Sequence, residues 1–351
     1  MLYILGVPVR LILVTLLAVG VLLPGTGVLA GSGYADHADA GAFMDELEAR
    51  GLDRDYVREL LADAERKDSI LEAIARPAEK TLTWGEYRQI FIQPDRIAQG
   101  EQFWREHREL LKRAESEYGV SRYIITAILG VETRYGRHKG SYRVLDALAT
   151  LGFDYPPRAQ FFRKQLRAFL LMEEDAGIDA GSLKGSYAGA MGYPQFIPTS
   201  YRAYAVDFND DGRTDLVHTI ADAIGSVANY FAEHGWRDNL PVAARARVSG
   251  EDYKNVFSKA MKPSTTLGKL RERGVTPVRC DGAAIPSPHC FQLPDDTRVA
   301  PLHLEGEHGS EFWLGTKNFY VITRYNHSPL YAMAVYQLAR ALEQRIGETG
   351  S

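Results

Sequence analysis

The stretch SRYIITAILGVETRYG, residues 121–136, predicts a helix with one apolar face that carries a carboxylate. Ser121 can cap the start of this helix, and Gly136 can end it. At about 3.6 residues per turn, the stripe that contains Glu132 also contains three aliphatic side chains, those of Ile125, Ile128 and Leu129. The sequence therefore places an acid where a core residue is expected.

Glu132 on this face is expected to lose part of its hydration. Loss of hydration disfavours the charged form and raises the pKa of a carboxyl group, which suits a general acid near neutral pH. The alternative is a salt bridge from Glu132 to Arg134 or Arg137. Structural ion pairs are commoner than catalytic acids, so the helix alone leaves both interpretations open.

Length and composition indicate a folded protein of several units. The chain has 351 residues, of which 45% are hydrophobic, with 41 Lys and Arg against 45 Asp and Glu. This length allows roughly two or three domains, and this apolar content excludes a wholly disordered chain. The balanced charge argues against electrostatic binding of nucleic acid. We expect a monomer.

Residues 1–35 have the pattern of a secretory signal peptide. Arg10 precedes an uncharged run over residues 11–23, and two candidate cleavage sites with small residues end at Ala30 and Ala35. The run is short for a spanning helix, although an uncleaved anchor is the alternative. Because there is no cysteine near the exit, a lipid on an N-terminal cysteine is excluded. We expect an exported protein that is not a lipoprotein.

The chain contains two cysteines, Cys280 and Cys290. In an oxidising compartment these two residues are expected to form a disulfide, and the alternative is a pair of free thiols. A zinc site would need further close ligands besides His289.

The rest of the chain divides by composition. Residues 42–119 and 121–235 carry apolar residues at helical spacing, whereas residues 239–304 contain short β-prone runs separated by Pro, Gly and Asp. A last helical pattern, LYAMAVYQLARALEQRI, covers residues 330–346. These patterns predict an α+β fold that is predominantly helical.

Residues 207–215, DFNDDGRTD, follow the start of a calcium-binding loop. In such a loop, alternate positions bind the cation through side-chain oxygens, here those of Asp207, Asn209 and Asp211. The next alternate position, Arg213, would bind it through the backbone carbonyl. The twelfth position is His218 instead of Glu, so Asp222 is the expected replacement ligand. We expect calcium in a structural role, with sodium possible in its place, and the alternative is a metal-free turn.

Three longer motifs extend the interpretation: ILGVETRYGRHKG at residues 128–140, SYAGAMGYPQFIPTSY at 186–201 and NFYVITRYNHSPLYAMAV at 318–335. Together they resemble the lytic murein transglycosylases of the B type, family 3, over about residues 40–345. The resemblance implies cleavage of the β-1,4 bond between N-acetylmuramic acid and N-acetylglucosamine in peptidoglycan, without water and with 1,6-anhydro products. It also implies a lysozyme-like core, a helical domain built from both chain ends and a small β domain.

The resemblance implies the following organisation along the chain. A periplasmic enzyme follows the signal peptide of residues 1–35. Its domains are the helical domain of residues 40–115, completed by 312–348, the catalytic core of 116–236, which includes the calcium loop, and the β domain of 237–311. The expected partner is the peptidoglycan strand, and proteins of cell-wall synthesis or division are candidate protein partners.

The same resemblance assigns site residues by position. Glu132 matches the family's catalytic glutamate, and the family also has an Asp at the position of Asp222. Positions in or near the sugar-binding cleft are matched by Ser186, Gln195, Tyr230, Tyr325, Asn326 and Tyr331, and outer positions by Tyr87 and Arg158. Pro157 occupies a position where some relatives have a second arginine.

Most glycosidases use two carboxylates, and no second acid lies in an equivalent motif near Glu132, although Asp154 is the nearest candidate. One carboxylate suffices if the substrate supplies the nucleophile. Glu132 would first donate a proton to the glycosidic oxygen and then accept one from the C6 hydroxyl of the muramic acid. The alternatives are a hydrolytic muramidase on the same scaffold and a non-catalytic peptidoglycan-binding protein.

Overall fold

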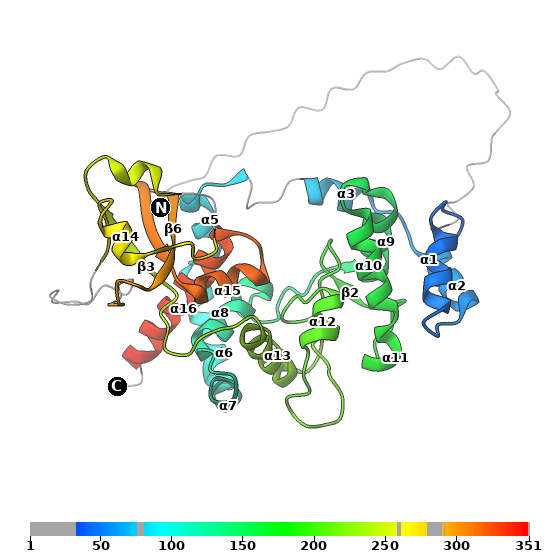
Figure 1. Ribbon diagram of the computed structural model, residues 1–351. Coiled ribbons are helices and arrows are strands. Elements are labelled where there is room, and N and C mark those ends of the chain that lie inside the picture. The colour runs from blue at the N-terminus through cyan, green and yellow to red at the C-terminus, as the bar shows by residue number, and fades with distance from the viewer. Residues whose placement is uncertain (1–32, 76–80, 258–260, 279–289, 291, 350–351) are drawn as a thin grey trace, which may run out of the picture.

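The computed structural model describes residues 33–75, 81–257, 261–278, 290 and 292–349. It shows two helical cores side by side and a small sheet at one end (Figure 1). This arrangement confirms the predicted α+β class with mainly helical structure. Within these ranges, no helix combines the length and the apolar character needed to cross a bilayer. Most of the predicted signal peptide, residues 1–32, lies outside the described residues.

The first helical core combines the start of the chain with its middle. Its helices include α1 (Ala40–Glu48), α2 (Arg54–Asp63), α3 (Asp68–Ala75), α9 (Val144–Asp154) and α10 (Ala159–Leu170). Fully buried side chains from both parts meet in it, among them Leu47, Leu61, Ile70, Leu148 and Phe169. Shorter elements complete the unit: η1 (Pro156–Arg158), α11 (Met172–Ala176), α12 (Pro198–Tyr204) and the two-stranded β1 (Tyr142–Arg143) and β2 (Lys184–Gly185).

The second core surrounds the helix that the opening motif predicts, α8 (Arg122–Thr133). It also contains α5 (Trp84–Phe91), α6 (Pro94–Glu106), α7 (Arg108–Tyr118), α13 (Ile220–Glu233), α15 (Lys317–Tyr325) and α16 (Pro329–Thr349). The long helix α16 packs against α8 and also contacts α5 and α6. The C-terminal part of the chain therefore closes the core that holds Glu132.

The small sheet has five antiparallel strands in the order β4 (Thr265–Thr266), β6 (Arg298–Gly306), β7 (Gly309–Gly315), β3 (Ala243–Val248) and β5 (Val275–Pro277). β6 and β7 form a hairpin in which Gly306 pairs with Gly309. Helix α14 (Leu267–Arg271) covers a small apolar cluster, and η2 (Asp252–Asn255) lies in the same unit. The chain passes from β7 directly into α15, which connects the sheet to the second core.

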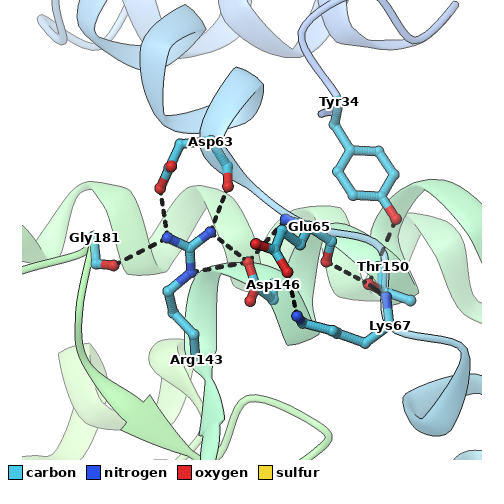
Figure 2. A network of polar contacts seen from close by, with 8 residues as sticks. All are labelled: Tyr34, Asp63, Glu65, Lys67, Arg143, Asp146, Thr150 and Gly181. Carbon is cyan, nitrogen blue, oxygen red and sulfur yellow. Dashed lines mark hydrogen bonds and ion pairs between the residues drawn. The ribbon is translucent and has the colours of Figure 1, made fainter. Parts of the chain in front are cut away.

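Residues 40–115, expected to form one helical domain, contribute to both cores. Helices α1 to α3 pack with α9 and α10, whereas α5 to α7 pack with α8 and α16. A polar network centred on Arg143 connects the end of α2 to α9 (Figure 2). Arg143 bonds Asp146 at 2.6 Å, the Asp63 carbonyl at 2.5 Å and the Gly181 carbonyl at 3.3 Å. Amphipathic faces are visible in the sequence, but the partner that each face chooses is not.

Candidate active site

Glu132 lies in the last turn of α8 and is half-buried. The three aliphatic residues of its stripe, Ile125, Ile128 and Leu129, are fully buried. The carboxylate therefore lies where the buried stripe meets the surface, where it can exchange protons with a ligand.

The helix ends earlier than the sequence predicts, at Thr133 instead of Gly136. Arg134, Tyr135 and Gly136 have positive φ angles of 51°, 61° and 87°. Thr133 holds this turn, because its hydroxyl donates to the Tyr193 carbonyl at 3.0 Å and accepts from the Gly136 amide at 2.9 Å. The backbone that follows Glu132 is thus fixed by side-chain hydrogen bonds.

Two glycines accommodate the ring of Tyr135 beneath this turn. A Cβ atom at Gly100 would lie 2.3 Å from the Tyr135 hydroxyl, and one at Gly130 would lie 2.6 Å from it. Only glycine allows so close an approach at these positions. Tyr135 is itself one of the residues with a positive φ angle. The packing of its ring against Gly100 and Gly130 therefore stabilises the tight turn beside Glu132.

Tyr331, near the start of α16, bonds the carboxylate directly. Its hydroxyl donates to Glu132 Oε1 at 2.5 Å, and its side chain is 2% exposed. Burial, and then the negative charge of Glu132, raise the pKa of Tyr331 well above its ordinary value. Tyr331 therefore stays neutral and serves as a fixed hydrogen-bond donor. Tyr87 of α5, also buried, lies close enough to raise the Tyr331 pKa slightly further.

Tyr325, the last residue of α15, lies parallel to Tyr331 with ring centres 6.4 Å apart. Its hydroxyl donates to the Pro194 carbonyl at 2.6 Å. Burial, followed by the charge of Glu132, raises the pKa of Tyr325 well above its ordinary value. Tyr230 packs edge-on against Tyr325 at 4.9 Å, and its hydroxyl donates to the Arg324 carbonyl at 2.6 Å. Because Tyr230 is only 6% exposed, its main role here is to pack against the Tyr325 ring.

Ser186 and Gln195 organise the loop between β2 and α12. The Ser186 hydroxyl accepts from the amides of Ala188 at 3.2 Å and Ala190 at 3.0 Å. Gln195, at a φ of 52°, donates from Nε2 to the Gly192 carbonyl at 2.9 Å and to the Lys139 carbonyl at 3.2 Å. Gln195 thus ties this loop to the segment that follows Glu132.

The two other predicted positions are Asn326 and Arg158. Asn326 follows Tyr325 at the end of α15 and is half-buried. Arg158 is exposed, and its guanidinium lies 4.2 Å from the Phe161 ring centre. It lies beyond the far end of α9, a helix about 16 Å long that starts next to β1. Glu132 and the tyrosines at 87, 325 and 331 are therefore brought together, whereas Arg158 has no hydrogen bond, ion pair or ring contact with this group within the described residues.

Several supporting residues were not predicted from the sequence. Phe231 stacks on Tyr325 at 5.7 Å, and Phe196 lies at the same distance from the Tyr325 ring. Thr133 and Tyr193 hold the turn after Glu132. Thr133, Tyr193 and Phe196 all lie within the quoted motifs, but their contacts depend on packing between distant segments.

Asp222, at the start of α13, is fully buried beneath the predicted calcium loop. Its two oxygens accept from the Phe208 amide and the Asp215 amide, each at 2.8 Å. Burial raises the pKa of Asp222, and the negative charges of Asp207 and Asp211 add to this effect. The loop therefore concentrates negative charge around a buried carboxylate.

The loop is ordered by its own backbone. Asp207 accepts from the amides of Asp211 at 3.2 Å and Gly212 at 2.7 Å, and Asp211 accepts from the Arg213 amide at 2.9 Å. Asn209 donates to Asp211 at 2.8 Å. Within the described part of the chain, no three His, Cys, Asp or Glu side chains already form a metal-binding group. The donor set still fits a hard cation, because a cation would relieve the repulsion between Asp207, Asp211 and Asp222.

Of the two cysteines expected to pair, Cys290 takes part in a disulfide bond, and Cys280 lies outside the described residues.

Comparisons with known proteins agree with this geometry. The family described as transglycosylase SLT domain matches residues 35–340. The chain is 42% identical over 322 residues to membrane-bound lytic murein transglycosylase B of Escherichia coli, an alignment that covers 89% of this chain and 84% of the relative.

Solved structures give the same result. Soluble lytic transglycosylase SltB1 of Pseudomonas aeruginosa superposes with a TM-score of 0.80 at 49% identity, covering 87% of this chain and 98% of that one. Lytic transglycosylase Slt35 of E. coli in complex with calcium gives a TM-score of 0.80 at 40% identity, covering 93% and 100%. The chain therefore belongs to the transglycosylase SLT domain family, among the lytic murein transglycosylases of the B type.

Proposed function

We propose that this lytic transglycosylase cleaves the bond between N-acetylmuramic acid and N-acetylglucosamine with Glu132 as its one acid and base. The observation that carries this proposal is the half-buried Glu132 carboxylate, held by the neutral Tyr331 hydroxyl at 2.5 Å among buried rings. A single carboxylate held in this way can give up and regain one proton in sequence.

In the first step, protonated Glu132 donates its proton to the glycosidic oxygen as the bond from that oxygen to C1 breaks. The 2-acetamido group of the substrate shields the developing positive charge at C1. In the second step, the C6 hydroxyl oxygen bonds to C1, and its proton passes to the Glu132 carboxylate. The product is a 1,6-anhydro sugar, Glu132 is protonated again, and no water is consumed.

The surrounding residues position the substrate and the acid. Tyr331 orients one carboxylate oxygen, and Tyr325 presents a ring anchored through Pro194. Such rings bind sugar faces and exclude water, which favours attack by the C6 hydroxyl. Ser186, Gln195 and Asn326 would line the adjoining sugar subsites, with Tyr87 deeper and Arg158 outermost.

Calcium is proposed as a structural ligand of the loop of residues 207–215. Asp207, Asn209, Asp211, the Arg213 carbonyl and Asp222 would hold it, and sodium could take its place. The calcium complex of Slt35 and the concentration of carboxylates around Asp222 support this proposal. Chelation should lower the melting temperature of the protein, and calcium should restore it. An unchanged melting temperature would argue for a metal-free turn.

An envelope location is proposed, with export to the periplasm by the N-terminal signal. Of the two predicted cleavage positions, Ala30 is favoured because Tyr34 is 5% exposed and donates to Asp154 at 2.6 Å. Cleavage after Ala35 would remove this buried side chain. N-terminal sequencing of the exported protein distinguishes the two positions from an uncleaved anchor.

The deciding experiment is digestion of purified peptidoglycan followed by mass spectrometry. Wild-type protein should release 1,6-anhydro products, which are one water lighter than the reducing products of a muramidase. Glu132→Gln should reduce lysis by roughly 10³-fold or more while the protein stays folded. Glu109→Gln, which changes an exposed carboxylate on α7, serves as the control.

Reducing products would replace the proposal with a hydrolytic mechanism. Lysis that persists in Glu132→Gln would remove this residue from the chemistry. Binding of peptidoglycan without any bond cleavage by wild-type protein would indicate a binding protein.

A further inference from the structure

A basic pocket lies between the start of α15, the loop of residues 237–240 and the edge of the small sheet. Its cavity has a volume of about 460 Å³. Among the described residues, four cationic side chains line it, those of Arg237, Lys262, Arg298 and Lys317, together with one carboxylate, Asp296. The protein as a whole has a formal charge of −4, so this concentration of positive charge is local.

The pocket is built on fixed backbone. Asn318 of α15, fully buried, donates to the carbonyls of Arg237 at 2.8 Å and Leu240 at 2.7 Å and accepts from the Arg237 amide at 2.9 Å. The Thr316 hydroxyl donates to the Pro241 carbonyl at 2.6 Å. On the sheet side, Arg298 donates to the Ser264 carbonyl at 3.3 Å. A ligand would therefore meet a preformed site at low ordering cost.

Within the described residues, none of the four cations of the pocket has an ion pair within 4.0 Å. The charge of Lys317 also acts outside the pocket: burial lowers the pKa of His234, and the charges of Arg324 and then Lys317 lower it further. Unpaired cations in a concave site attract anionic groups.

Helix α15 begins at the pocket and ends beside the residues that surround the catalytic glutamate. Lys317, Tyr320 and Arg324 lie three, four and seven positions apart, so they share a stripe on this helix. Tyr325, the next residue after Arg324, packs against Tyr331 beside Glu132. Lys317, which lines the pocket, and Tyr325, which packs beside Tyr331, are thus about 12 Å apart along the helix axis. A polymer bound at Glu132 could reach the pocket with a side branch.

We propose that this pocket binds the peptide stem of the peptidoglycan strand through the stem's carboxylates. The inference rests on the proposed function, because it takes peptidoglycan as the polymer at Glu132. The stem carries free carboxylates together with an amino group, and the pocket offers four cations together with Asp296. The Asp296 carboxylate would repel a phosphate polymer but can pair with the amino group of a peptide stem, so the mixed charge favours the peptide.

The experiment compares two soluble glycan ligands, one with stem peptides and one from which an amidase has removed them. Binding is measured by calorimetry in the Glu132→Gln background to limit turnover. We expect tighter binding of the stem-bearing ligand. The added substitutions Arg298→Gln and Lys317→Gln should weaken that binding by about fivefold and abolish the preference. Added salt should reduce the preference in the unsubstituted pocket.

The matched control is Arg247→Gln with Lys269→Gln, which removes two exposed cations of the same β unit from outside the pocket. It should keep the preference, and equal melting temperatures show that both double variants are folded. Equal binding of the two ligands by the intact pocket would overturn the proposal. So would binding of soluble polyphosphate that the pocket substitutions abolish while stem binding is unaffected. The lytic activity of wild-type protein tests the proposed function separately.

Discussion

Glu132 and Asp222 are both withdrawn from solvent, but they are held in opposite ways. Glu132 bonds a phenol that lies 199 positions away in the sequence, and it remains half-buried. Asp222 accepts hydrogen bonds from two backbone amides, 14 and 7 positions away, and is fully buried. The first arrangement leaves a carboxylate open to proton exchange with a ligand. The second binds both oxygens to the fold, so Asp222 is suited to a structural role.

The largest effect expected from this contrast is on stability at Asp222. Asp222→Asn replaces one acceptor oxygen with an NH₂ group that faces a backbone amide donor. We expect a loss of about 3 kcal/mol in the free energy of unfolding, because a buried donor is left unsatisfied. Urea denaturation measures this change. Asp210→Asn, at an exposed position of the same loop, should change stability little, and equal losses would contradict the structural role of Asp222.

A smaller effect is expected at Tyr331, and it should appear in activity. Tyr331→Phe removes the hydroxyl that orients Glu132, and a hydrogen bond to a charged group of this kind contributes about 2 kcal/mol. We expect kcat/KM for peptidoglycan to fall by roughly thirtyfold. Tyr336→Phe is the matched control on α16, because the buried Tyr336 hydroxyl donates to the Ala243 carbonyl at 2.7 Å. A similar loss of activity in both variants would mean that Tyr331 acts only through packing.

The smallest effect concerns a third carboxylate, Glu101, which pairs with Arg345 of α16 and with Arg105. The hydrogen bond from Arg345 is the main cause that lowers the pKa of Glu101 below its ordinary value of 4.5. Its stabilising contribution is therefore present above pH 4.5 and is lost as the pH falls through the lowered pKa. We expect this contribution to the free energy of unfolding to be about 1 kcal/mol, since Arg345 is half-exposed.

The Glu101 contribution is checked by comparing wild-type protein with Glu101→Gln in urea across pH. The difference in stability between the two should shrink on acidification. A constant difference from pH 7 to pH 3 would show that Glu101 contributes by packing instead of charge. Glu109→Gln should differ little from wild type, because Glu109 is exposed on α7.

The sequence predicted the helix of residues 121–136 and the apolar stripe that contains Glu132, because helical periodicity is local. It missed the early end of this helix, since the hydrogen bond from Thr133 to Tyr193 joins residues 60 positions apart. It also does not show that residues 40–115 contribute to both hydrophobic cores. Amphipathic spacing reveals that a face will be buried, but not against which partner.

The sequence by itself determined the mainly helical α+β class, the family and the acid on an apolar helix face. These features depend on spacing between near neighbours and on motifs in a fixed order. Only the tertiary structure decided which phenol bonds Glu132 and that four cations from separate segments share one pocket. Such contacts join residues that are distant in the chain, and they form only when the helices and the sheet pack together.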